Sequence, residues 1–220
     1  MISKKKIIIY SINDPYFTLP TLNKIFNHLY KSYDVDIYFG KLLLRKKIKA
    51  ILWLVLNGSL FNLIKLYLSK KKYTKLQNKK ILDKRESSYE FGISFNYQQK
   101  LKEKHKIYNF HLGDFKNQRG IFIFFYKFKY NWKTIDLTFH RINAKFDSGK
   151  ILNKKVINVQ NKNSMDIIEL YYKNIKFIVE SLNMINKKKN TEKYSKFKNY
   201  NSEPSFLEII LKGLNLNNLN

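Results

Sequence analysis

Two side chains with complementary chemistry stand two residues apart in the run YNFH at residues 108–111. Because successive side chains of a strand point to opposite faces, Asn109 and His111 are predicted to share a face and lie next to each other. A histidine can take or give a proton near neutral pH, and an asparagine amide can donate a hydrogen bond to an oxyanion. Asp147, in the tight turn FDSG at residues 146–149, is a candidate carboxylate to orient the imidazole. A lone histidine is more often structural, so the pattern alone leaves this trio as one hypothesis.

Other kinds of chemistry find less support in the sequence. The chain has no cysteine, which excludes disulfide scaffolds, thiolate zinc sites, iron–sulfur clusters and cysteine nucleophiles. The turn SINDP at residues 11–15 contains no glycine, so the dinucleotide fingerprint is absent, and there is no Walker loop. No metal is expected, because the sequence shows no paired spacing of metal ligands such as HExxH among its four histidines, His28, His105, His111 and His140. For His140 the prediction is a strand residue with a local partner.

The charge balance points to a polyanionic partner. A formal net charge of +27 would attract nucleic acid, an anionic membrane, or a ligand rich in phosphate or carboxylate. The lysines are spread along the chain among many Asn and Ile residues, so a compositional bias of the genome remains an alternative explanation. We expect no secretory signal after the basic start, and therefore a cytoplasmic protein.

One apolar segment, residues 51–68, raises the question of membrane contact. It is nearly as long as the roughly 20 residues that span a bilayer. Polar interruptions such as Asn57 and Lys65 favour instead a helix buried in a soluble domain.

The elements around the candidate residues alternate between strand and helix signals. Strands are predicted at residues 6–10, 34–39, within 89–97, and at 107–110, 134–142 and 156–159. Helices are predicted at about residues 19–30, through 42–73 and at 165–184, with 70–84 as an exposed helix end or loop. The aromatic run at residues 121–130 is predicted to pack in the core rather than to stack on nucleic acid bases. This order predicts an α/β fold with a mostly parallel sheet.

Several stretches, in the same order, resemble the formyltransferase family. The run NFHLGDFKNQRG at residues 109–120 is similar without a gap to the signature N-x-H-P-S-L-L-P-x-x-R-G. TFHRIN at residues 138–143 resembles the family's T-x-H-x-x-D segment, and DSG at 147–149 its D-x-G. Near the start, DPYFTLPTL at residues 14–22 is similar to the TPDFAVPTL opening of methionyl-tRNA formyltransferases. The resemblance covers roughly residues 5–160, and ordered matches are far more specific than one motif.

The resemblance implies a fold, a reaction and a set of site residues. The fold would be Rossmann-like, a mostly parallel twisted sheet flanked by helices, with a short C-terminal extension. A primary amine would attack the formyl carbon of 10-formyltetrahydrofolate and give an N-formyl product through a tetrahedral intermediate. Asn109 would donate to the developing oxyanion, His111 would manage the proton and stabilise that oxyanion, and Asp147 would orient His111 and assist proton transfer.

The resemblance also implies residues on the cofactor and acceptor sides. The acceptor side would hold Arg119 and Gly120. The folate would lie against the loop and the turn that contain Tyr97, Gln99, Lys100, Leu101, Asn143 and Phe146. The departures, Leu112-Gly113 for Pro-Ser and Phe115-Lys116 for Leu-Pro, affect the loop beside the catalytic pair.

The acceptor amine stays open between two classes. The turn at residues 11–15 does not resemble the phosphate loop of glycinamide ribonucleotide formyltransferases. Methionyl-tRNA formyltransferases carry an additional C-terminal barrel, for which the residues after Val159 are too few, whereas enzymes acting on nucleotide-linked amino sugars end in smaller additions. We therefore expect a nucleotide sugar, with tRNA as the alternative, and a homodimer is possible. A catalytically inactive binding protein and a basic membrane-surface protein using residues 42–68 are the non-enzymatic alternatives. The expected division is a catalytic domain at residues 1–186 and a lysine- and asparagine-rich tail at 187–220.

Overall fold

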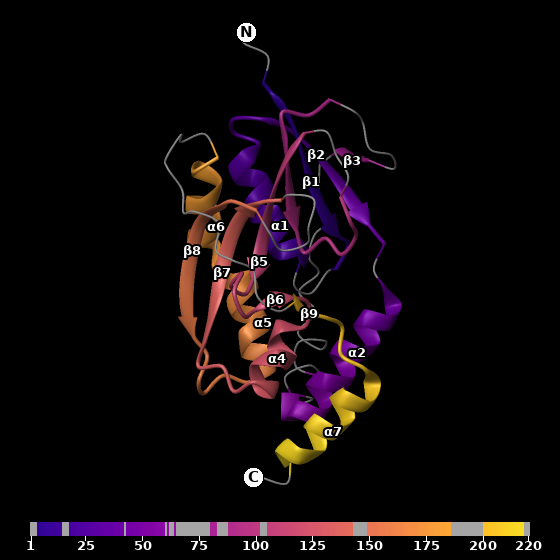
Figure 1. Ribbon diagram of the computed structural model, residues 1–220. Helices are drawn as coiled ribbons and strands as arrows, with labels where there is room; N and C mark the ends of the chain where they lie inside the picture. Colours follow the sequence, from indigo (N-terminus) through magenta and orange to yellow (C-terminus); the bar gives the residue numbers. More distant parts are fainter. Residues whose placement is uncertain are drawn as a thin grey trace.

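A seven-stranded sheet forms the centre of the computed structural model, which describes residues 4–14, 18–41, 43–59, 61, 64, 80–82, 88–101, 105–142, 149–185 and 200–217. The strand order is β3-β2-β1-β4-β5-β7-β8, parallel from β3 to β5 and antiparallel at β7 and β8 (Figure 1). The strands are β1 Lys6–Ile12, β2 Asp34–Gly40, β3 Lys80–Leu82, β4 Phe91–Phe95, β5 Lys106–Leu112, β7 Thr134–Arg141 and β8 Ile151–Asn158. The predicted mostly parallel α/β fold is confirmed.

Helices and a small second sheet complete the described part of the chain. The helices are α1 Thr18–Leu29, α2 Leu44–Leu54 with a π-helical turn η1 at Val55–Ser59, α4 Ile123–Lys129, α5 Ser164–Lys173, α6 Ile175–Asn183 and α7 Phe206–Asn217. The second sheet pairs β6, Arg119–Gly120, with β9, Tyr200–Asn201. Within the described residues, no helix combines the length and the hydropathy that crossing a bilayer requires.

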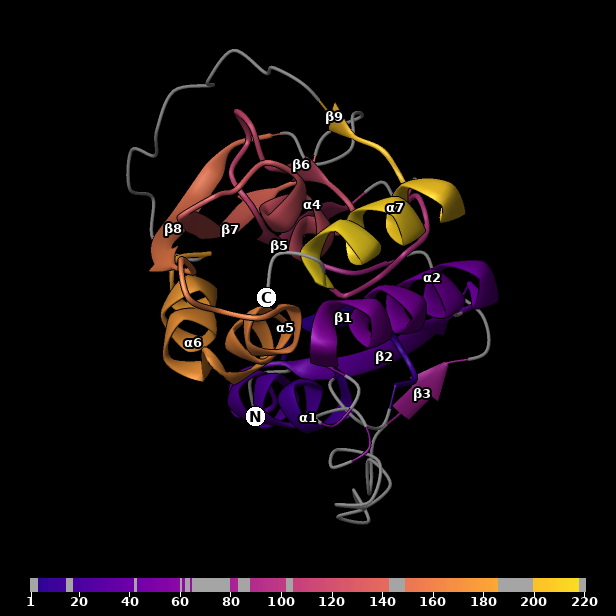
Figure 2. The ribbon, with the colours of Figure 1, turned by 90° about the horizontal axis from the view of Figure 1, so that it is seen from below.

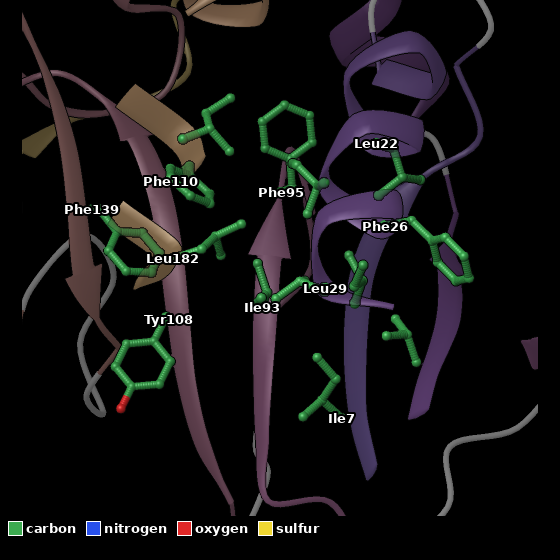
Figure 3. Packing of buried hydrophobic residues seen from close by; sticks show 14 of the residues in the cluster. Ile7, Leu22, Phe26, Leu29, Ile93, Phe95, Tyr108, Phe110, Phe139 and Leu182 are labelled. Carbon is green, nitrogen blue, oxygen red and sulfur yellow. The ribbon is translucent and has the colours of Figure 1, made fainter. Parts of the chain in front are cut away.

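The main core lies between one face of the sheet and helices α1 and α6 (Figure 3). On α1 the buried apolar side chains recur at helical spacing, from Leu22 through Ile25 and Phe26 to Leu29. The strands contribute every second residue, such as Ile93 and Phe95 of β4. Each such side chain stabilises the fold by about 1.5–3 kcal/mol when it leaves water.

A smaller core joins α2, α4 and α7 at the lower end of the molecule in Figure 1. Trp53 is fully buried there with Phe125 and Ile209. The side chain of Lys49 is also buried, and its Nζ lies 2.7 Å from Glu203 Oε1 and donates to the Pro204 carbonyl at 2.6 Å. This ion pair fixes the segment before α7 against α2. The aromatic run at residues 121–130 lies largely in α4 and packs into the core, as predicted.

Three predictions of local structure need correction. The closing helix is divided, because the Asn174 amide donates to the Leu170 carbonyl at the end of α5 and its backbone leaves the helical conformation. Within the expected helix end or loop at residues 70–84, Lys80–Leu82 forms strand β3 by pairing with β2. Pairing with β2 therefore makes this segment a strand, although the sequence around it is polar.

The long helix predicted from residue 42 is the third correction. Its regular α-helical part, α2, passes after Leu54 into the π-helical turn, and residues 61 and 64 are again helical. One face of α2 is exposed, as at Leu44 and Ile48. Apart from residues 61, 64 and 80–82, the chain at 60–87 lies outside the described residues, as do residues 186–199 of the predicted tail. Residues 200–217 form β9 and α7.

Candidate active site

The candidate residues meet where β5 and β7 run side by side. In the antiparallel register, Asn109 lies opposite His140 and His111 opposite Thr138. The imidazole rings of His111 and His140 are nearly perpendicular, with centroids 6.4 Å apart. Tyr108 and Phe110, which alternate with these residues, lie in the main core on the other face. Asn109 and His111 therefore lie on the face of the sheet opposite the main core, the face that also carries Ile107 and its apolar cluster.

Asn109 is held by the side chain of His140. Its Nδ2 lies 3.2 Å from His140 Nε2, and an amide nitrogen can only donate. The His140 Nε2 must therefore accept, which leaves the proton on Nδ1, where the Arg141 carbonyl lies 3.3 Å away. The pair fixes one N–H of the Asn109 amide and leaves its second N–H to donate elsewhere. His140 is 1% exposed and has the local strand partner that the sequence predicts for it.

His111 is buried between the strand and the loop that follows it. Its Nε2 lies 3.2 Å from the Gln118 carbonyl, so this nitrogen carries a proton and donates. The Phe115 ring packs edge-on against His140 at 4.6 Å between centroids and lies 6.3 Å from His111. Phe115 thus limits the space in which both imidazoles can move.

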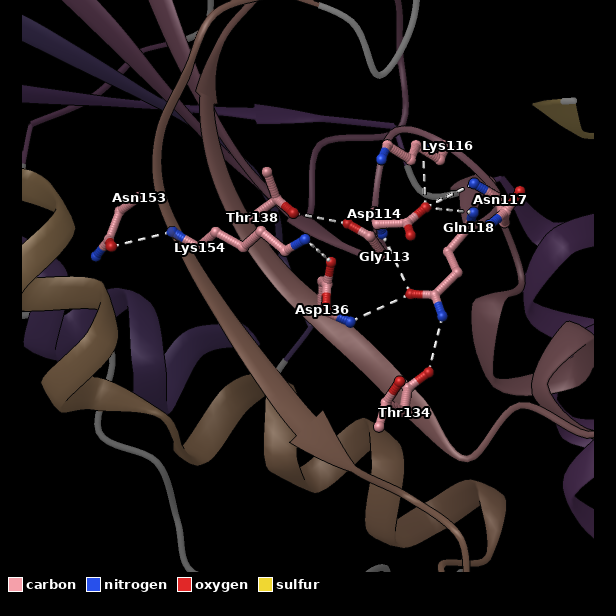
Figure 4. Close-up of polar contacts among 10 residues, drawn as sticks. All are labelled: Gly113, Asp114, Lys116, Asn117, Gln118, Thr134, Asp136, Thr138, Asn153 and Lys154. Atoms are coloured by element: carbon pink, nitrogen blue, oxygen red, sulfur yellow. Dashed lines mark hydrogen bonds and ion pairs between the residues drawn. The ribbon is translucent and has the colours of Figure 1, made fainter. Parts of the chain in front are cut away.

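The loop after His111 is closed by the carboxylate of Asp114 (Figure 4). Asp114 Oδ1 accepts from the backbone N–H groups of Lys116, Asn117 and Gln118 at 2.9, 2.6 and 2.9 Å. Backbone donors gathered on one carboxylate are charge-assisted and stronger than neutral pairs. This arrangement holds the loop without the two prolines of the family signature.

Gln118 ties the same loop to strand β7 (Figure 4). Its Oε1 accepts from the backbone N–H groups of Asp114 and Asp136, both at 3.2 Å, and its Nε2 donates to the Thr134 carbonyl at 2.8 Å. Thr138 Oγ1 donates to the Gly113 carbonyl at 2.7 Å. The backbone carbonyl of Gln118 also accepts a hydrogen bond from His111, so Gln118 positions both the loop and the imidazole.

Gly113 is required by the close approach of two backbone segments. Its φ is +131°, and a Cβ there would overlap the Gln118 carbonyl oxygen and lie 3.0 Å from His111 Nε2. Glycine is the residue that adopts this conformation without steric cost. A serine at position 113 would therefore be strained and would clash in this loop.

The loop predicted on the cofactor side follows β4. Tyr97 Oη donates to Gln99 Oε1 at 3.0 Å, and its ring contacts Tyr10 at 5.6 Å between centroids. Lys100 is exposed, and Leu101 packs on the cluster around Tyr10. The sequence prediction missed Gln98, whose Oε1 is buried and has no hydrogen-bond partner within the described residues. Only the fold shows this, because a glutamine in a loop carries no signal of burial.

The start of this loop is anchored by a polar network. Asn96 has a φ of 54° and donates to Thr18 Oγ1 at 2.9 Å and to Tyr172 Oη at 2.6 Å. Burial of its hydroxyl raises the pKa of Tyr172 far above its ordinary value, so the phenol stays protonated. The turn after β4 is thereby joined to both α1 and α5.

Arg119 and Gly120, predicted on the acceptor side, lie in β6 and are buried. The guanidinium carbon of Arg119 lies 5.8 Å from the centroid of the Tyr200 ring, and Asn201 Nδ2 donates to the Arg119 carbonyl at 2.9 Å. Gly120 has a φ of +107°, and a Cβ there would overlap the Asn201 carbonyl oxygen. The segment at residues 200–201 therefore packs against β6, the strand that follows the loop at residues 113–118.

The remaining predicted residues, Asn143, Phe146 and Asp147, lie outside the described residues. Within the described part of the chain, no three His, Asp or Glu side chains are grouped to hold a metal ion.

Solved structures share this architecture. A 4-N formyltransferase from Francisella tularensis superposes with a TM-score of 0.62 at 20% identity, over 90% of this chain and 76% of that one. The chain has the formyltransferase fold. WlaRD, a sugar 3N-formyl transferase solved in the presence of dTDP and 5-N-formyl-THF, gives a TM-score of 0.62 at 17% identity over 90% and 69% of the two chains.

The formyltransferase fold also occurs as part of a longer protein. HypX from Aquifex aeolicus, solved in complex with tetrahydrofolic acid, gives a TM-score of 0.59 at 11% identity over 94% of this chain and 31% of that one. No protein-family model and no curated protein matches the chain. The resemblance read from the sequence is therefore confirmed for the fold.

Proposed function

We propose that this protein transfers the formyl group of 10-formyltetrahydrofolate to a primary amine, as a cytoplasmic enzyme. The observation that carries the proposal is the pair of Asn109 and His111 on one face of β5, both beside His140, in a formyltransferase fold. The order of the motif residues along the chain supports the same reaction.

The chain's own residues have separate tasks in this reaction. The second N–H of Asn109 donates to the formyl oxygen as that oxygen gains negative charge. His111, whose Nε2–H is held by the Gln118 backbone carbonyl, is proposed to exchange that partner for the charged oxygen and to pass a proton between the attacking amine and the leaving nitrogen. The amine nitrogen would first add to the formyl carbon, and the tetrahedral adduct would then break its bond to the folate nitrogen, which takes up the proton that the amine gives up. Asp147 is proposed to orient His111.

The loop after β4 fits a folate. The buried Gln98 Oε1, without a partner within the described residues, is an acceptor for a ring N–H of the pterin. When bound, the cofactor supplies an activated formyl group. Tyr97, Gln99, Lys100 and Leu101 are proposed to contact it, together with Asn143 and Phe146.

The acceptor is proposed to be the amino group of a nucleotide-linked amino sugar, bound on the side of Arg119 and Gly120. Two of the similar structures are 4-N and sugar 3N formyltransferases, and WlaRD was solved with dTDP. The net charge of +27 also suits a diphosphate.

The test is a discontinuous assay of tetrahydrofolate release from 10-formyltetrahydrofolate. Amino sugars linked to dTDP and methionyl-tRNA are supplied separately, and the N-formyl product is identified by mass spectrometry. Formylation of a dTDP-amino sugar supports the proposal in full. Formylation of tRNA alone overturns the acceptor, and no formylation of either amine by a folded protein contradicts the proposed activity.

A further inference from the structure

Helix α2 turns a stripe of apolar side chains to solvent. Leu44, Ile48 and Ile51 follow one another at spacings of four and three residues, so they lie on one helix face. They are 68%, 47% and 45% exposed, while Lys49 and Trp53 on the opposite side are buried. A helix that only served the protein core would carry polar residues on its outer face.

Helix α7 carries a second stripe of the same kind. Leu207, Ile210 and Leu211 share one of its faces and are 64%, 39% and 53% exposed. Gly213 lies on the inner side, where a Cβ would be 2.6 Å from Leu56 Cβ, so α7 packs closely on the end of α2.

The two stripes form one surface. Trp53 of α2 and Ile209 of α7 are buried in the same cluster, so the opposite sides of both helices face away from it together. Figure 2 shows α2 and α7 side by side across the lower end of the molecule. We call the six side chains of the two stripes the α2–α7 face.

The surroundings of the α2–α7 face are basic. Lys41, Arg45 and Lys47 are exposed beside it, and the sequence contains no acidic residue between Asp36 and Asp83. The nearby acids are neutralised within the chain. Glu203 pairs with Lys49 at 2.7 Å and with the exposed Arg45 at 3.5 Å, and Glu208 pairs with Lys129 at 2.9 Å. An apolar stripe with a cationic border is the pattern of helices that lie in the interface of an anionic bilayer.

We propose that the α2–α7 face docks onto the surface of an anionic phospholipid bilayer. The apolar side chains enter the boundary between headgroups and acyl chains, and Arg45 and Lys47 contact the lipid phosphates. The net charge of +27 favours an anionic bilayer over a second copy of the chain as the partner of this face. Two copies would bring their basic borders together and repel each other. The docked helix is connected to the candidate site, since β9 directly precedes α7 and pairs with β6.

The test is flotation of the full-length protein with vesicles. Vesicles of equal parts phosphatidylglycerol and phosphatidylcholine are compared with vesicles of phosphatidylcholine alone. We expect binding to the anionic vesicles that weakens as salt rises. The variant Ile48→Gln/Leu211→Gln should bind at least about tenfold more weakly, because two apolar side chains are lost from the interface. Arg45→Gln/Lys47→Gln should weaken binding by about the same factor or more.

Two matched controls test whether weaker vesicle binding is specific to the α2–α7 face or follows from any loss of surface hydrophobicity or charge. Val156→Gln replaces an exposed apolar residue on β8, and Lys24→Gln/Lys31→Gln removes two exposed charges at α1. Both should bind like the unchanged chain. Absence of binding to anionic vesicles overturns the proposal, as does equal binding by the Ile48→Gln/Leu211→Gln variant. A dimer in sedimentation equilibrium that this variant dissociates overturns it too and assigns the face to a second copy. Formyl-transfer activity without vesicles is independent of all these outcomes.

Discussion

At the scale of single residues, Asn109 depends on a neighbour from the adjacent strand. Its amide is oriented by His140, so one N–H is committed and the other can serve a developing oxyanion. Replacing Asn109→Ala removes that donor and should lower kcat about 100- to 1,000-fold, with little change in folate binding. Steady-state kinetics and folate titration measure the two quantities. The exposed Asn27→Ala on α1 serves as the control and should keep full activity.

His140 acts through Asn109 in this account, so it is a positioning residue. His140→Ala leaves the amide unheld and should lower kcat by up to about 100-fold while folate affinity is kept. His140→Gln supplies another acceptor and should restore part of the rate. A purely structural role predicts a different result, in which both variants lose stability and folate affinity together and the glutamine gives no rescue.

At the scale of elements, the loop after β5 depends on one carboxylate. Asp114→Ala leaves three backbone N–H groups without their acceptor and should lower the free energy of unfolding by about 1.5–3 kcal/mol. Asp114→Asn keeps an acceptor oxygen and should cost less. Urea unfolding of the two variants measures the difference. A loss below about 0.5 kcal/mol for Asp114→Ala would mean that the loop is held by other contacts.

Helix α7 has a predicted response to acid. The Lys49 ammonium lowers the pKa of the Glu203 carboxyl, and the Ser205 backbone N–H and Lys129 lower that of Glu208. Groups whose folded pKa is depressed stabilise the fold fully above their ordinary pKa of 4.5 and lose this contribution as pH falls through the lower folded value. Thermal stability should therefore fall below about pH 4.5.

Paired variants check the assignment of this pH dependence. Glu203→Gln/Glu208→Gln should be less stable at neutral pH and show a flatter profile in acid, measured by the melting temperature followed through tryptophan fluorescence. A profile as steep as that of the unchanged chain would place the acid-sensitive groups elsewhere.

The sequence predicts elements whose signal is local. The spacing of Leu22, Ile25, Phe26 and Leu29 specifies the buried face of α1, and this helix is found where it is predicted. Strand β3 and the division at Asn174 are not predicted, since one depends on pairing with β2 and the other on a side-chain bond to the Leu170 carbonyl.

The site shows the same limit. The motif predicts Asn109 and His111 as a pair, but the contact of Asn109 with His140 depends on the register of β5 against β7. The carboxylate network of Asp114 and the buried amide of Gln98 likewise follow from tertiary contacts that one sequence does not display. The predicted division of the chain at residue 186 stays a prediction.

At the scale of the whole molecule, one mixed and mostly parallel sheet supports both the candidate site and the α2–α7 face. The candidate catalytic residues lie where β5 pairs with β7. The smaller core around Trp53 packs helices α2 and α7 together at the lower end of the molecule. The segment from β9 to α7 contacts β6, next to the loop at residues 113–118 that follows His111.

The proposed reaction requires that this fold bind a formylated folate. Calorimetric titration of the purified protein with 5-formyltetrahydrofolate, a stable mimic of the formyl donor, tests this binding without any assumption about the acceptor. We expect saturable binding near one molecule per chain, weakened in Gln98→Leu, which removes the buried acceptor. No detectable binding by a sample shown to be folded would contradict it.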